Sequence, residues 1–212
     1  MIKLDDVDVM VLEYFIHYIT LTSYKFSKDT GIPSATAWRV FNRLSEFGLI
    51  KKDEKGFTIT ARGVVITFLN TKKEIIRKRA LSLLKKLWKY EGEEEDLGYF
   101  INDLCALLKS LNISPFAICF NQPITVATML YNNIDNLSES TKKVIASMFL
   151  NFFPSTELGN GCKLIVSFDN EGKPYAIAAN CKKEGIRLNY RCPELMEKFL
   201  GRSNDVVLRR VY

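Results

Sequence analysis

A short helix between two turns constrains this chain more than any other stretch. Residues 31–50 have the sequence GIPSATAWRVFNRLSEFGLI, in which Pro33 disfavours helical geometry in the residue before it and Gly48 favours a stop. Between these turns the apolar residues recur at helical spacing. They predict one buried face, formed by Ala37, Val40, Phe41 and Leu44. A tryptophan and two arginines are thereby held off that face, and they need an explanation.

Two further helices are predicted before this one. In residues 5–20 an apolar stripe at helical spacing consists of Val7, Met10, Val11, Tyr14 and Tyr18. Aspartates fill the first turn, where the helix dipole favours negative charge. A shorter helix extends from an N-cap at Ser23 to a stop at Gly31, and Ser34 can cap the helix that follows. Two helices joined by a tight turn that contains glycine form a helix-turn-helix.

The hydrophobic period changes after this helix. Residues 49–60 begin with two apolar residues and continue through a charged turn closed by Gly56. Phe57 and Ile59 then alternate with threonines, a pattern that predicts a short β-hairpin. Three helices followed by a two-stranded hairpin predict a winged helix in residues 1–70.

Two helices with separate start signals are predicted in residues 61–90. Thr60 can cap the first, and Thr71 with Glu74 has the spacing of a capping box, so we expect a break near residue 70. The second helix, in residues 71–90, carries lysines and arginines over most of its surface. Its apolar stripe consists of Ile75, Ile76, Ala80, Leu83, Leu84, Leu87 and Trp88. This basic amphipathic helix is predicted to serve in dimerisation or in phosphate contact.

An acidic break at residues 91–96 is the expected domain boundary. The C-terminal domain, residues 97–212, is predicted to be α+β and to serve in dimerisation or in sensing a small-molecule or protein effector. We expect helices at 96–110, 123–135, 138–152 and 193–200 and strands within 162–181, 185–192 and 205–212. The fold class expected for the whole chain is α+β: a winged helix-turn-helix, a basic linker helix and a C-terminal α+β domain.

The charge of the chain is divided unevenly. Residues 1–90 hold 17 Lys and Arg against 9 Asp and Glu, whereas residues 91–212 hold 13 against 15. A basic first part favours a polyanionic partner, although solubilising surface lysines give the same count. No apolar run approaches the ~20 residues that cross a bilayer, and the aspartates in the first ten residues argue against a signal peptide. We therefore expect a cytoplasmic protein without membrane contact.

Metal, cofactor and catalytic sites are not predicted. The five cysteines include no C-x-x-C pair, and His17 is the single histidine, so a zinc site has too few ligands. Cys162 and Cys181 fall on neighbouring predicted strands, where reduced thiols and a cross-strand disulfide are both compatible with the pattern. Asp169, Glu171 and Lys173 resemble the carboxylates and lysine of metal-dependent nucleases. Because all three fall in one hairpin turn, turn geometry explains them better.

The stretch PSATAWRVFNRLSEFGLIKKDEKGFTITARG resembles the recognition helix and wing of winged-helix transcription regulators of the MarR/PadR-like type. The matching residues are Leu44, Gly48, Leu49, Ile50, Ile59, Thr60 and Gly63. The resemblance covers about residues 5–70 and implies a DNA-binding fold that commonly dimerises through helices following the wing. Trp38 departs from the family pattern, which has a small polar residue there, and the wing is short.

A DNA-binding surface is predicted from these residues. A recognition helix seated in the major groove reads bases with residues near its N-terminus. The helix is expected to contribute Ser34, Ala35, Thr36, Trp38, Arg39, Asn42 and Arg43. Lysines that would contact phosphates are Lys25, Lys28, Lys51, Lys52 and Lys55.

The sequence therefore predicts a sequence-specific double-stranded DNA-binding protein, a homodimeric transcription regulator that reads the major groove with helix 34–47. One alternative is a DNA-processing protein, such as a nuclease or a replication or partition factor, that docks through its winged helix. A second is a winged helix used for protein–protein contact, with Trp38 as the partner anchor.

Overall fold

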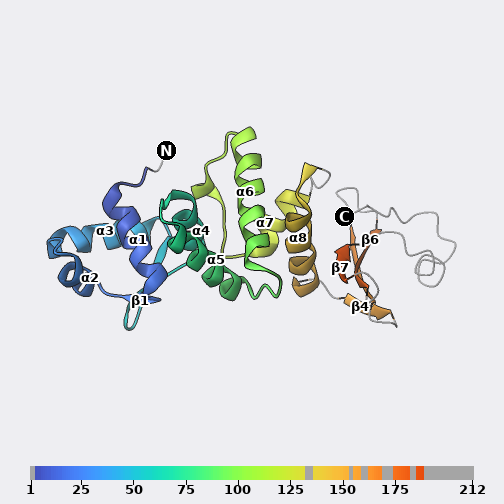
Figure 1. The fold of residues 1–212 in the computed structure, drawn as a ribbon, viewed down its shortest axis with the longest axis horizontal. Coiled ribbons are helices and arrows are strands. Elements are labelled where there is room, and N and C mark those ends of the chain that lie inside the picture. Colours follow the sequence, from blue (N-terminus) through green and yellow to red (C-terminus); the bar gives the residue numbers. More distant parts are fainter. Residues whose placement is uncertain are drawn as a thin grey trace. The chain divides into compact units, whose positions relative to one another are not determined.

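The computed structural model describes residues 3–131 and 136–152 and, beyond them, strands within 155–188; side-chain environments are described for 3–131, 136–145 and 147–148. The chain divides into two compact units (Figure 1). Unit 1 comprises Met1–Tyr90 with Leu104–Pro123, and unit 2 comprises Glu91–Asp103 with Ile124–Tyr212. The segment Leu104–Pro123, which the sequence placed in the C-terminal domain, thus groups with the N-terminal elements.

Helix α1, Asp6–His17, begins with a reciprocal cap in which Asp5 and Asp8 each accept the other's backbone N–H. The buried apolar residues of the helix are Val11, Leu12, Phe15 and Ile16. The predicted stripe was therefore rotated, since Met10 and Tyr18 are 38% and 43% exposed. A helix this rich in apolar residues offers two overlapping stripes, and tertiary packing selects one.

The predicted second and third helices are present. Helix α2, Ser23–Thr30, is capped by Thr22 rather than Ser23 and ends at Gly31, whose φ of 75° suits glycine. Helix α3, Ser34–Glu46, follows Pro33 and has no side-chain cap, so the predicted cap at Ser34 was wrong.

Three strands form an antiparallel sheet in the order β1-β3-β2. The predicted hairpin consists of β2, Ile50–Asp53, and β3, Gly56–Ile59, with Ile50 opposite Ile59. Strand β1, Thr20–Leu21, pairs with β3 and was not predicted, because two residues carry no periodicity. It ties the link between α1 and α2 to the hairpin.

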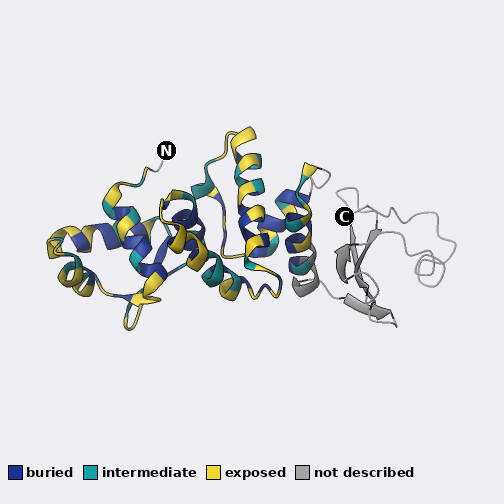
Figure 2. Cartoon of the chain, viewed as in Figure 1, coloured by how far each residue is buried: buried dark blue, intermediate teal, exposed yellow. Residues whose placement is uncertain are grey.

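The core of unit 1 buries the predicted face of α3 (Figure 2). Ala37, Phe41 and Leu44 are 0% exposed and Val40 is 5% exposed. The ring of Phe41 lies 5.4 Å from that of Phe15, 5.8 Å from that of Phe26 and 5.4 Å from that of Phe57, measured between centroids. These contacts join α3 to α1, α2 and β3.

Helices α4, Ala61–Asn70, and α5, Glu74–Trp88, confirm the predicted break. Thr60 caps α4 as predicted, accepting the Gly63 N–H at 3.1 Å. The predicted capping box at Thr71 is wrong: α5 starts after Lys73 without a side-chain cap, and the Thr71 hydroxyl instead donates to Glu13 on α1. The Thr71 hydroxyl thus bonds a residue distant in sequence and does not cap the helix next to it.

The segment Leu104–Pro123 packs within unit 1. It contains the C-terminal part of α6, Glu94–Ser110, and the 3-10 helix η1, Pro115–Ala117. The indole Nε1 of Trp88 donates to the buried carbonyl of Phe120 at 2.9 Å. This bond fixes the end of α5 against the segment.

Unit 2 contains α7, Pro123–Tyr131, and α8, Glu139–Phe152. Asp103 orders the start of α8 by accepting hydrogen bonds from the backbone and side chain of Ser138 and from Thr141. An antiparallel sheet has the order β4-β5-β6-β7. Its strands are Ser155–Leu158, Cys162–Phe168, Pro174–Cys181 and Gly185–Leu188.

The predicted strands within 162–181 and at 185–188 are confirmed, whereas β4 was not predicted. The predicted turn at 169–172, residues 189–192, the helix at 193–200 and the strand at 205–212 lie outside the described residues. Helices with two antiparallel sheets make the chain α+β, as predicted at that level. None of the described helices combines the length and apolar content that crossing a bilayer requires.

We predict that Gly63→Ala destabilises the protein, although the same change at most helical sites stabilises by about 0.4–1 kcal/mol. A Cβ at Gly63 would lie 2.1 Å from the backbone oxygen of Leu49, which already accepts the Thr60 N–H. Because a backbone carbonyl cannot swing aside, we expect a loss of about 1–3 kcal/mol in urea unfolding. An unchanged or higher midpoint would contradict this packing.

Candidate nucleic-acid interface

The side of α3 opposite the core is exposed at Ala35, Trp38 and Arg39 and half-buried at Asn42. It presents Ala35, Trp38, Arg39 and Asn42, of which Trp38 is 61% exposed. Arg39 and Asn42 make no side-chain hydrogen bond or ion pair with another described residue. Their guanidinium and amide groups are therefore available to an external partner.

The N-terminus of α3 carries unsatisfied backbone donors. Pro33 precedes the helix without a side-chain cap, and the first amide of the helix with a backbone partner in the described structure is that of Ala37, bonded to Pro33 O at 3.0 Å. Ser34, Ala35 and Thr36 are all exposed there. Free amides and the positive end of the helix dipole attract anions such as phosphate.

Helix α2 meets this end of α3 through a hydrogen bond of 3.0 Å between the hydroxyls of Ser27 and Ser34. Lys28 follows Ser27 and is exposed. Lys25 is also exposed, and its ammonium lies 4.4 Å from the centroid of the Tyr18 ring, a cation–π contact that restrains it.

The lysines of the β2–β3 hairpin lie on both faces of the sheet. Lys52 lies on the face of Ile50 and Phe57, which packs against α3, whereas Lys51 alternates to the opposite face. Both are exposed, as is Lys55 in the turn. Asp53 at the end of β2 and Glu54 in the turn make the tip of the hairpin less basic than Lys51 and Lys52 before it.

Arg43 is engaged within the protein, unlike Arg39. Its Nη2 lies 2.7 Å from Asp5 Oδ2 and 2.5 Å from Asp8 Oδ1, and the Asp8 side chain is only 1% exposed. Partial burial alone would raise the pKa of Asp5, but the Asp8 amide and Arg43 hold that pKa below its ordinary value. Arg43 thus anchors α3 to α1 and is poorly placed to read bases.

Arg62 is a positioning residue that the sequence analysis did not single out. From α4 its Nη1 donates to Phe47 O at the end of α3, and its Nε donates to Ile118 O. The position of an arginine after a cap residue carries no signal for such distant carbonyl partners.

The apolar stripe of α5 is largely buried inside unit 1. Ile76, Ala80, Leu84 and Trp88 are at most 5% exposed, while Ile75 and Leu87 remain 61% and 45% exposed. The stripe therefore packs within the chain and does not form a continuous outward seam for a second copy.

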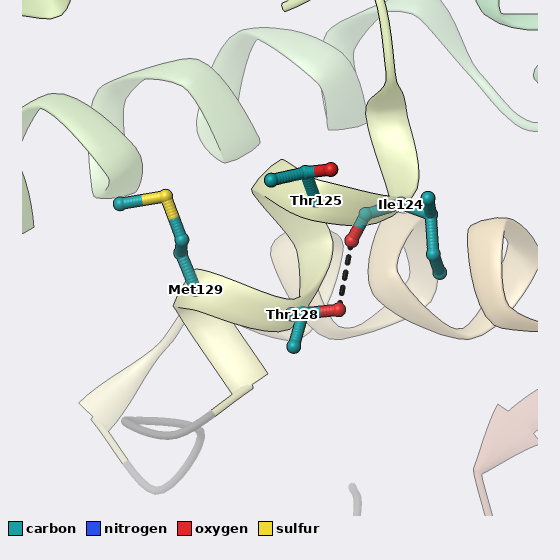
Figure 3. Close-up of a pocket in the computed structure, with 4 residues that line it drawn as sticks. All are labelled: Ile124, Thr125, Thr128 and Met129. Atoms are coloured by element: carbon teal, nitrogen blue, oxygen red, sulfur yellow. Dashed lines mark hydrogen bonds between the residues drawn. The ribbon is translucent and has the colours of Figure 1, made fainter. Parts of the chain in front are cut away.

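Other predicted sites fall mainly in unit 2. Asp169, Glu171 and Lys173, which resembled a nuclease set, lie outside the described residues, as do the side chains of Cys162 and Cys181. The described residues contain no cluster of potential metal ligands. A hollow of about 370 Å³ on α7 is lined by Ile124, Thr125, Thr128 and Met129 (Figure 3). All four belong to one helix and none is charged, so this hollow does not resemble an effector site.

Comparison of the chain with protein-family models, curated proteins and solved structures found no match.

We predict that Arg43→Ala destabilises the protein by about 1–3 kcal/mol, because Asp5 and the buried Asp8 lose the cation that they share. Arg39→Ala on the same helix is the matched control and should change stability by less than about 0.5 kcal/mol, since its side chain has no described partner. Urea unfolding at neutral pH measures both.

The Arg43→Ala deficit should shrink as the pH falls below about 4. The lowered pKa of folded Asp5 contributes stability above the ordinary aspartate pKa and loses it as the carboxylate takes up a proton. Equal deficits for the two arginine variants would contradict the assigned anchor role.

Proposed function

We propose that this chain is a sequence-specific double-stranded DNA-binding protein, a transcription regulator whose N-terminal winged helix-turn-helix inserts α3 into the major groove. The observation that carries the proposal is the outer face of α3, where Arg39 and Asn42 are unengaged beside an uncapped helix N-terminus.

The arrangement of elements supports this proposal. Helix α1, strand β1, helices α2 and α3 and the β2–β3 hairpin follow one another in the order of a winged helix. The aromatic core buries one side of α3 and leaves the other to solvent. A reading helix needs such rigid support because base contacts depend on accurate placement.

The chemistry of the exposed side chains also fits duplex DNA. Arginine donates two hydrogen bonds to guanine O6 and N7, and asparagine pairs with adenine N6 and N7. Lys28 and Lys52, with the amides at the start of α3, are suited to hold phosphates, which fixes orientation without selecting sequence. In this proposal Arg43 is omitted from the base-reading set because Asp5 and Asp8 hold it.

The regulator would act in the cytoplasm as a homodimer on paired half-sites, since one α3 reads only a few base pairs. Because the α5 stripe is buried within unit 1, the contact between copies is proposed to lie elsewhere. A role of unit 2 in this contact or in sensing an effector belongs to the same proposal.

A second candidate function is docking to a protein. Trp38 and Tyr24 are 61% and 72% exposed on α3 and α2, and exposed aromatic residues of this size are common anchors at protein interfaces. In that case the outer face of α3 would bind a partner chain in place of bases.

We predict that Arg39→Ala weakens binding to the preferred duplex by about 1–3 kcal/mol and relaxes the choice of one base pair. Selection from a random duplex library by the wild type and the variant measures both effects. If the base preference survives unchanged, α3 does not read DNA through Arg39, and docking through Trp38 becomes the better explanation.

We predict that Lys52→Ala weakens binding to all sequences alike and lowers the salt slope by roughly one unit, because a phosphate contact is present at every site. Lys51→Ala is the matched control, since Lys51 lies on the opposite face of the sheet and should have a smaller effect. Titrations between about 50 and 200 mM salt provide the slopes. Binding by the wild type that is insensitive to salt would contradict the proposed phosphate contacts.

A further inference from the structure

Three lysines lie on the outward side of α5, Lys78, Lys85 and Lys86, and Lys89 follows directly after the helix as its C-cap residue. We call these four residues the α5 lysine face. At 3.6 residues per turn the three helical lysines fall within an arc of about 100°, opposite the buried stripe of Ile76, Ala80, Leu84 and Trp88. Lys78, Lys86 and Lys89 are exposed and Lys85 is half-buried.

This charge is not neutralised within the described structure. None of the four lysines forms an ion pair there, in contrast with Lys73, whose Nζ lies 2.6 Å from Glu13 Oε2. The one acidic residue of α5 is Glu74, in the first turn. Arg79 adds a further cation beside the face and contacts the ring of His17.

The α5 lysine face does not suit a second copy of the same helix. Its apolar stripe is buried against its own unit, and pairing the outward sides would bring eight lysines together. Like charges at such spacing destabilise an interface. A polyanion is the complementary partner.

Helix α5, which carries this face, lies on the other side of α1 from α3. Phe15 of α1 packs on Phe41 of α3, whereas Glu13 and His17 of α1 contact Lys73 and Arg79 at α5. Figure 1 shows α1 between α3 and α5 within unit 1. A straight duplex in contact with α3 is therefore separated from the α5 lysine face by α1.

We propose that the α5 lysine face binds the phosphate backbone of a second stretch of DNA duplex, so that one chain holds two duplex segments. The identity of this ligand rests on the proposed function. Lys78 and Lys86 are separated by about 12 Å along the helix axis, comparable to the rise of about three to four base pairs. Such a face contacts several phosphates and selects no sequence.

The test uses the full chain with Lys78→Gln and Lys86→Gln combined. Both residues are exposed and glutamine retains helix propensity, so the fold should persist, which a thermal melt checks. The matched control combines Lys109→Gln and Lys143→Gln, which remove the same charge from exposed positions of α6 and α8. Two duplexes of about 20 base pairs, one with a donor and one with an acceptor dye, report bridging, while titrations of one duplex give the salt slope.

We expect the wild type and the control to bring the two duplexes together, and the α5 variant to lose this transfer. The α5 variant should also lower the salt slope by about two units with its base preference intact. If the α5 variant shows the same salt slope and the same transfer signal as the control, the inference is overturned. This outcome includes the case in which a dimer brings two duplexes together through its two α3 helices alone.

The same experiment separates the two proposals. If Arg39→Ala relaxes base choice while the α5 variant matches its control, the proposed function stands and the second surface is rejected. If Arg39→Ala leaves the base preference unchanged but the α5 variant has a lower salt slope than its control, the base-reading role of α3 is rejected. The proposed binding of a duplex by the α5 lysine face then stands. If the wild type binds neither duplex, both are rejected.

Discussion

The ring of Phe41 is where three helices and the sheet of unit 1 meet. It is fully buried, with the rings of Phe15, Phe26 and Phe57 at centroid distances of 5.4–5.8 Å. Because these neighbours come from α1, α2 and β3, α3 cannot rotate about its axis without opening the whole core. The outward position of Arg39 and Asn42 is thus a consequence of aromatic packing on the opposite side of the helix.

Ion pairing within the protein distinguishes two arginines of α3 that the sequence alone does not tell apart. Arg39 and Arg43 are one turn apart on α3, yet Arg43 is paired with Asp5, the N-cap residue of α1, and with Asp8, while Arg39 has no described partner. The buried Asp8 carboxylate is stabilised by a paired cation, and in the described structure Arg43 is paired with it. In the same way, Lys73 at the start of α5 is paired with the largely buried Glu13 of α1. The cations that remain outward, on α3, on the hairpin and on α5, are those through which a polyanion could be bound.

Local sequence predicted most of the helices and the hairpin of unit 1. The turns at Pro33 and Gly48, the cap at Thr60 and the spacing around Phe41 each depend on nearby residues, and these predictions are confirmed. The predictions that failed depended on distant partners. The Thr71 hydroxyl bonds Glu13, and the α1 stripe rotates to face its neighbours. Strand β1 exists only because β3 pairs with it.

The turns that bound α3, the cap of α4, the apolar side of α3 and the excess positive charge of residues 1–90 all follow from the sequence alone. Tertiary contacts determine which cations form ion pairs within the protein and bury the α5 stripe within unit 1. They also bring residues 104–123 to that unit, through the bond from Trp88 to Phe120. The physical reason is range: caps and periodicity act within one or two helical turns, whereas burial and ion pairing depend on residues that only the folded chain brings together.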